Sequence, residues 1–114
     1  MRIIVISDTH QYYRNFETIV LRNPDADMFL HLGDGESEYH LLCRNMPEVA
    51  DKFRYVKGNC DYGSDAPLTE LIDVAPNHRI LATHGHRYRV NSTLDYLEQE
   101  ALENGCDVAL YGPT

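Results

Sequence analysis

Residues 2–10 read RIIVISDTH, an apolar run followed at once by polar side chains. The β-branched segment Arg2–Ile6 predicts a strand buried on both faces, as in sheets that helices cover. Asp8 and His10 follow this strand directly, and both side chains can ligate a metal ion. The chain therefore begins with a buried strand whose carboxyl end carries candidate ligands.

Polar side chains follow the later predicted strands in the same way. They are Asp34 after Asp27–Leu32, Asn59 and Asp61 after Phe53–Val56, and His84 and His86 after Arg79–Thr83. A single Asp after a strand is more often a turn former or a helix cap, and a single loop His is more often solvated. Ligands of open α/β sheets bind at the carboxyl ends of the strands, so the coincidence favours one shared site.

Helices and strands alternate along the rest of the chain. Apolar spacing predicts helices at Asn15–Leu21, Glu36–Met46 and Ser92–Glu103, the last capped by Asn91 or Ser92. Pro76-Asn77 predicts a hairpin that joins Leu68–Ala75 to the next strand, and Val108–Tyr111 is the last strand. This order is typical of a layered α/β fold, and the length of 114 residues predicts a single domain, residues 1–114.

Composition narrows the function classes. The chain has 18 acidic and 10 basic side chains, a net charge of -8, which argues against strong binding of nucleic-acid backbone. The longest apolar run, Ile3–Ile6, is far shorter than the about 20 residues of a membrane span, and Met1 is not followed by a signal peptide. Cys43, Cys60 and Cys106 form no CxxC pair, which indicates reduced thiols and a cytoplasmic protein without a membrane partner.

The candidate ligands also limit the choice of metal. Carboxylate, imidazole and amide groups together suit divalent manganese, iron, nickel or zinc better than calcium. Residues 34–38 (DGESE) lack the glycine and the distal glutamate of an EF-hand loop. The chain contains no GxxxxGK[ST], GxGxxG or GxSxG motif, so neither a phosphate-binding glycine loop nor a serine hydrolase is indicated.

The strand-end motifs resemble, in order and spacing, those of the calcineurin-like metallophosphoesterases. The DxH, GD, GN[HC]D and THGH blocks of that superfamily correspond to Ser7-Asp8-Thr9-His10, Gly33-Asp34, Gly58-Asn59-Cys60-Asp61 and Thr83-His84-Gly85-His86. The pattern is similar to that of the small bacterial and archaeal phosphodiesterases. The resemblance implies a four-layer αββα sandwich that carries two divalent metal ions, with manganese expected first and iron, nickel or zinc as alternatives.

The same resemblance implies roles for individual residues. Asp8 and His10 would ligate the first metal, Asp34 would bridge both, and Asn59 and His84 would ligate the second. Asp34, Asn59 and His84 would thus form the catalytic core, where a metal-bridging hydroxide attacks phosphorus in line. Cys60, Asp61 and His86 are expected around these ligands or at the substrate rim, and a plain turn role for Asp61 remains an equal alternative.

The chain departs from the fullest family pattern at its leaving-group residues. Cys60 stands where many members have the histidine thought to protonate the leaving group, and Ser37 stands where an aspartate would orient that histidine. Loss of a general acid costs about 10²–10⁴-fold in rate, and less for a good leaving group. Similar family members with a cysteine at this position act on phosphodiesters, so the resemblance implies a phosphodiesterase acting on a small phosphodiester.

A further departure lies at the end of the sequence. The family continues into a GHxH block, whereas this chain reads Gly112-Pro113-Thr114. Either the chain is truncated, without its C-terminal strands, or residues are omitted between Gly112 and Pro113. The alternative function is a non-catalytic scaffold, as in the retromer subunit of this fold, or a truncated inactive member, with a homodimer left open. The intact His10 and Asn59 argue against that alternative, and dispersed ligands argue against a metal-storage module.

Overall fold

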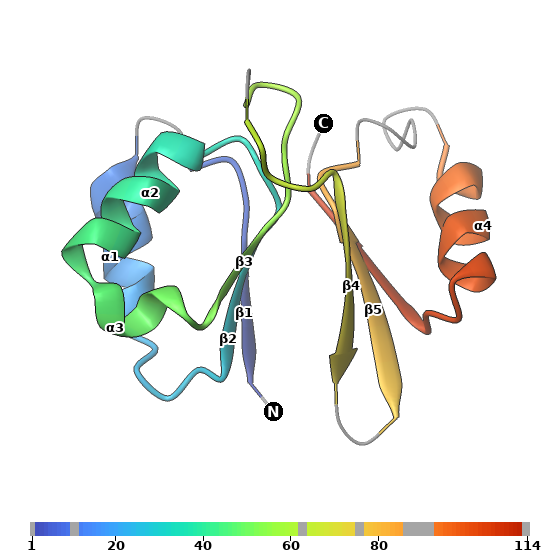
Figure 1. Ribbon diagram of the computed structural model, residues 1–114, viewed down its shortest axis with the longest axis horizontal. Helices are drawn as coiled ribbons and strands as arrows, with labels where there is room; N and C mark the ends of the chain where they lie inside the picture. The colour runs from blue at the N-terminus through green and yellow to red at the C-terminus, as the bar shows by residue number, and fades with distance from the viewer. Residues whose placement is uncertain (1, 10–11, 62–63, 75–76, 86–92, 113–114) are drawn as a thin grey trace.

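The structure, a computed structural model, describes residues 2–9, 12–61, 64–74, 77–85 and 93–112. Two three-stranded sheets face each other, and helices lie on the outer face of each sheet (Figure 1). The layers follow the order helix, sheet, sheet, helix. The predicted four-layer α/β sandwich is therefore confirmed.

The first sheet is parallel. Its strands β1 (Ile3–Ile6), β2 (Met28–His31) and β3 (Phe53–Tyr55) lie in the order β1-β2-β3. Their outer face is covered by α1 (Tyr13–Leu21), α2 (Glu36–Asn45) and α3 (Pro47–Ala50) (Figure 1). Because the strands run in one direction, the loops that follow all of them leave from the same edge of the sheet.

The second sheet combines a hairpin with a parallel strand. β4 (Thr69–Val74) pairs antiparallel with β5 (His78–Thr83), and β6 (Val108–Tyr111) lies parallel to β5. The helix α4 (Asp95–Glu103) covers the outer face of this sheet (Figure 1). The amide of Gly112 donates a hydrogen bond to the carbonyl of His84 (2.9 Å), which holds the end of β6 beside the end of β5.

Alternating side chains of the strands build separate layers of core. Phe29 packs with Phe16, Val20, Leu42 and Phe53 between the first sheet and its helices. The next residue of the same strand, Leu30, joins the cluster between the two sheets with Leu32, Val56, Ile72, Ile80 and Ala82. Leu81, Leu97, Ala101 and Cys106 pack between the second sheet and α4. The cluster between the sheets fixes the edge at which the strand-end loops meet.

Two local predictions were wrong. β1 is not buried on both faces, because it is the edge strand in the described part of its sheet, and Val5 is 45% exposed. The last helix begins at Asp95 rather than at Ser92, and the Thr93 hydroxyl accepts a hydrogen bond from the Asp95 amide (3.2 Å). Asn91 and Ser92, the predicted caps, lie outside the described residues.

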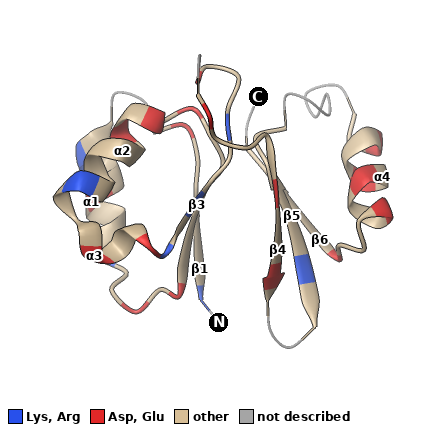
Figure 2. Ribbon diagram, in the orientation of Figure 1, with Lys and Arg blue, Asp and Glu red and all other residues tan. Residues whose placement is uncertain are grey.

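The helix α4 carries acidic residues and no Lys or Arg (Figure 2). None of the helices in the described ranges has the length and apolar character needed to cross a membrane.

Candidate metal centre

The candidate centre lies where the strands of the first sheet end. Asp8 and Asp34 follow β1 and β2, and both adopt left-handed backbone conformations, with φ of 55° and 63°. Aspartate tolerates this conformation better than most residues, and such strain often occurs at functional sites. The amide of Asp8 donates to the carbonyl of Gly33 (3.0 Å), which joins the two loops directly.

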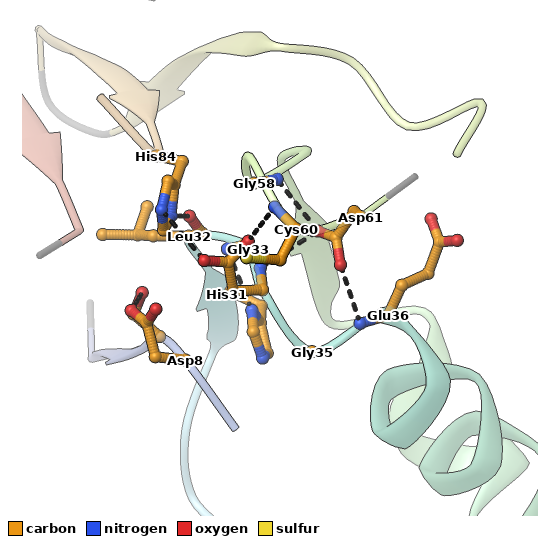
Figure 3. A network of polar contacts seen from close by, with 12 residues as sticks. Asp8, His31, Leu32, Gly33, Gly35, Glu36, Gly58, Cys60, Asp61 and His84 are labelled. Carbon is orange, nitrogen blue, oxygen red and sulfur yellow. Dashed lines mark hydrogen bonds and ion pairs between the residues drawn. The ribbon is translucent and has the colours of Figure 1, made fainter. Parts of the chain in front are cut away.

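Asp8, Asp34 and His84 form one group whose ligand atoms all lie within 4.8 Å of one another. Asp34 is 5% exposed and His84 is fully buried, with its Nε2 atom 3.3 Å from Asp34 Oδ2. Asp8 comes from the first sheet and His84 from the second, and both side chains lie at the same site (Figure 3). Carboxylate oxygens and an imidazole nitrogen at this spacing fit a divalent transition-metal ion.

The hydrogen bond of His84 fixes the orientation of its ring. Nδ1 lies 2.7 Å from the carbonyl oxygen of Leu32, which can only accept, so Nδ1 carries the proton and donates. The other ring nitrogen, Nε2, is the atom that faces Asp34. Metal-bound histidines commonly donate their other ring N–H to a carbonyl in this way.

Backbone groups of the loop after β3 orient Asp34. The Cys60 amide donates to Asp34 Oδ1 (2.8 Å). Gly58 packs against the same carboxylate so closely that a Cβ atom at position 58 would lie 2.1 Å from Asp34 Oδ1. Asn59 lies between these two residues on the exposed part of the loop. The approach of the loop to Asp34 therefore requires glycine at position 58.

Asp61 connects the same loop to the start of α2. Its carboxylate accepts hydrogen bonds from the amides of Gly58 (2.9 Å) and Glu36 (3.4 Å) (Figure 3). It also accepts hydrogen bonds from the amide of Asp34 (3.0 Å) and from the Tyr55 hydroxyl (2.7 Å). Burial raises the pKa of Asp61, but these hydrogen bonds outweigh it and hold the pKa below its ordinary value. Asp61 therefore holds its own turn through the Gly58 amide and also bonds to the backbone amide of Asp34.

His31, the last residue of β2, was not among the predicted site residues. Its ring is fully buried, and burial lowers its pKa to about 4. Nδ1 accepts a hydrogen bond from the Gly33 amide (3.1 Å), and Nε2 lies 2.8 Å from the hydroxyl of Thr9. The only sequence signal was a polar residue inside an otherwise apolar strand, immediately before Gly33-Asp34.

The predicted site residues are distributed as follows. The structure brings together Asp8, Asp34 and His84, with Cys60 and Asp61 beside them; His10 and His86 lie outside the described residues. Cys60 is exposed, and the negative charge of Asp34, followed by smaller effects that include Asp61, raises the pKa of its thiol. A protonated thiol is a poor nucleophile.

Facing sheets between helices, with carboxylates and a histidine gathered at the strand ends, are the arrangement expected of the metallophosphoesterase fold. The calcineurin-like phosphoesterase superfamily domain matches residues 1–114, and the chain belongs to this family.

Relatives agree with this assignment. The Bacillus subtilis (strain 168) protein named "Probable metallophosphoesterase YsnB" is 34% identical over 113 residues, 98% of this chain and 63% of that protein. A crystal structure from Streptococcus pneumoniae TIGR4, described as a predicted phosphoesterase, has a TM-score of 0.78 at 30% identity and covers 97% of this chain and 60% of its own. Vps29 from Chaetomium thermophilum shares the fold, with a TM-score of 0.73 at 23% identity over 96% of this chain and 60% of that protein. The chain thus spans less than two thirds of the length of these relatives.

Proposed function

We propose that this chain is a cytoplasmic phosphodiesterase that uses two divalent metal ions, with manganese as the first choice, to hydrolyse a small phosphodiester. The observation that carries the proposal is the group formed by Asp8, Asp34 and His84. These donors fit a divalent cation because two are anionic oxygens and the third is an imidazole nitrogen with a fixed tautomer. Family membership supports the phosphoester bond as the target.

Asp8 and His10 would hold one cation, Asn59 and His84 the other, and Asp34 would bridge them. Bound cations supply positive charge that polarises a phosphoryl oxygen and lowers the pKa of water, so that hydroxide is present near neutral pH. The chain's own contribution is orientation. The Cys60 amide holds one oxygen of Asp34, and the Leu32 carbonyl holds the ring of His84.

The preference for diesters follows from Cys60. A thiol whose pKa is raised by Asp34 is a weak acid toward a leaving alkoxide at neutral pH, and this position holds no histidine to do the same work. A substrate with a good leaving group depends least on a side-chain proton donor. We therefore infer that a diester with a good leaving group, such as a chromogenic diester, is hydrolysed without help from a side-chain proton donor.

The test is hydrolysis of a chromogenic phosphodiester and of its monoester analogue, with manganese titrated into chelator-stripped protein. Asp34→Asn removes the proposed bridging charge and is expected to abolish turnover. Asp51→Asn is the matched control, because Asp51 is an exposed aspartate that follows α3. Diester turnover that needs manganese and disappears only in Asp34→Asn supports the proposal. A folded wild-type protein without turnover at saturating manganese contradicts it.

The second candidate is a non-catalytic scaffold, and the exposed apolar residues at the sheet edges favour it. Val5 of β1 is 45% exposed and Val108 of β6 is 40% exposed. Alternation along the strands places them on the same faces as Ile3 and Leu110, which contact the cluster between the sheets. Such edges offer a surface for another protein or for a second copy of this chain. Manganese binding without turnover, together with a dimer in sedimentation experiments, would favour this candidate.

A further inference from the structure

We propose that His31 is a positioning residue that holds together the two loops carrying Asp8 and Asp34. Its Nε2 atom lies 2.8 Å from the hydroxyl of Thr9, the residue after Asp8. Its Nδ1 atom accepts a hydrogen bond from the amide of Gly33, the residue before Asp34 (3.1 Å). One buried ring therefore bonds to a neighbour of each carboxylate. This inference rests on the metal site of the proposed function.

The bonding pattern requires a neutral histidine. The amide of Gly33 can only donate, so Nδ1 of His31 must carry the lone pair. The proton of a neutral ring is then on Nε2, which donates to the Thr9 hydroxyl. No other side chain offers a donor and an acceptor at opposite positions of a rigid ring. Asparagine can reproduce the bond to Gly33 and glutamine the bond to Thr9, and phenylalanine can make neither.

The surroundings prevent the ring from moving to other partners. His31 is fully buried, with the ring of Phe16 at 5.5 Å in an edge-on arrangement and the ring of Tyr55 at 4.7 Å. The missing side chain at Gly35 leaves space for the Thr9 hydroxyl and the His31 ring to come together. A Cβ atom at position 35 would lie 2.0 Å from Thr9 Oγ1 and 2.9 Å from His31 Nε2. The close fit on both sides indicates a fixed ring rather than one of several arrangements.

The expected consequence is a site whose carboxylates are in place before a cation binds. The Asp8 amide already bonds to the Gly33 carbonyl (3.0 Å), and the ring of His31 ties the same two loops a second time. Without the ring, a cation would have to bring the loops together at the expense of its own binding. Residues that support metal ligands through hydrogen bonds typically change metal affinity by about 10–100-fold when they are replaced.

The experiment measures manganese affinity of the chelator-stripped chain by calorimetric titration, which does not depend on turnover. His31→Phe keeps a ring but removes both bonds, and we expect it to weaken binding by at least about 10-fold. His31→Asn and His31→Gln each restore one bond and should lie between wild type and His31→Phe. Phe29→Leu is the control for lost stability, because Phe29 is 1% exposed and packs in the cluster between the first sheet and its helices. It should weaken folding but leave manganese affinity unchanged.

The outcomes separate the two proposals. Equal manganese affinity in wild type and His31→Phe overturns the positioning role and leaves the proposed function standing. Weaker binding by His31→Phe, in a wild type that binds manganese but hydrolyses no diester, supports the positioning role and contradicts the function. A loss of affinity in Phe29→Leu as large as in His31→Phe overturns the positioning role, because general destabilisation then accounts for the effect. A wild-type chain that binds no manganese overturns both.

Discussion

Lowering the pH from 6.5 to 4 should destabilise this fold through His31. The ring is fully buried, and burial lowers its pKa from 6.5 to about 4, against smaller opposing effects of the Asp61 and Asp34 charges. Above pH 6.5 the ring is neutral in the folded and the unfolded chain, so it causes no pH dependence. Between pH 6.5 and 4 only the unfolded chain takes up the proton, and the free energy of unfolding falls as the pH falls.

The size of the effect follows from the two pKa values. A lowering from 6.5 to about 4, at about 1.4 kcal/mol per pKa unit, corresponds to about 3 kcal/mol of lost stability at pH 4. This is a large fraction of the stability of a small domain, which is about 5–15 kcal/mol. Asp61 acts in a different window. Its lowered pKa supplies stability above the ordinary carboxyl value of 3.8, and this stability is lost only below it.

The assay is urea unfolding at a series of pH values from 8 to 4, with a chelator present so that no cation binds at the site. Far-UV circular dichroism is the probe, because the chain has no tryptophan. His31→Phe should be less stable than wild type at pH 8, and the difference should shrink by about 3 kcal/mol at pH 4. His40→Gln, at a side chain that is 62% exposed, should keep the wild-type slope. Parallel curves for wild type and His31→Phe would refute the reasoning.

Further predictions concern the surroundings of the site. Gly58→Ala places a methyl group on Asp34 Oδ1 and should weaken manganese binding by at least about 10-fold in calorimetry. Gly105→Ala, at φ +70 with nothing within 4 Å, should only lower the free energy of unfolding, by about 1–2 kcal/mol; equal manganese affinities in the two variants would argue against the close contact. Tyr55→Phe removes a donor to Asp61 and should cost about 1–3 kcal/mol in urea unfolding at pH 7, which an unchanged midpoint would contradict. Manganese at about 100 times its dissociation constant should add about 2.7 kcal/mol to the free energy of unfolding, and excess chelator should remove this gain; a melting temperature that ignores both would count against a metal site in the folded state.

The parts of this fold that could be predicted are those with a local signal. The apolar runs at β1 and β2 predict these two strands. Because the strands are parallel, Asp8 and Asp34, which follow them, lie at the same edge of the sheet. The four residues of α3 are too few to show a helical period, so this element was missed. The exposure of Val5 depends on the order of strands in the sheet, which no single strand encodes.

The residues that support the site could not be predicted, because their roles depend on contacts between distant parts of the chain. The role of His31 depends on Thr9, which lies 22 residues away along the chain, and on Gly33 in the next loop. A buried histidine in a strand can find hydrogen-bond partners in many ways, and only the folded structure shows which partners it has. The motif around Asp61 indicated that this residue lies beside the site. It did not indicate that the carboxylate accepts hydrogen bonds from amides of two loops, at Asp34 and at Gly58.

The site consists of proposed metal ligands and of a framework of buried residues that hold the ligand loops through hydrogen bonds. His31, Tyr55 and Asp61 are buried, and each side chain accepts a hydrogen bond from a backbone amide, so replacing them should reduce stability and metal affinity together. Asp8 is partly exposed and supplies charge to the site, so its replacement should reduce metal affinity with little loss of stability when no cation is bound. Measuring both quantities in each variant therefore distinguishes a ligand from a support without any assumption about the substrate. A framework variant that lost stability alone, with unchanged metal affinity, would mean that the residue does not support the ligands.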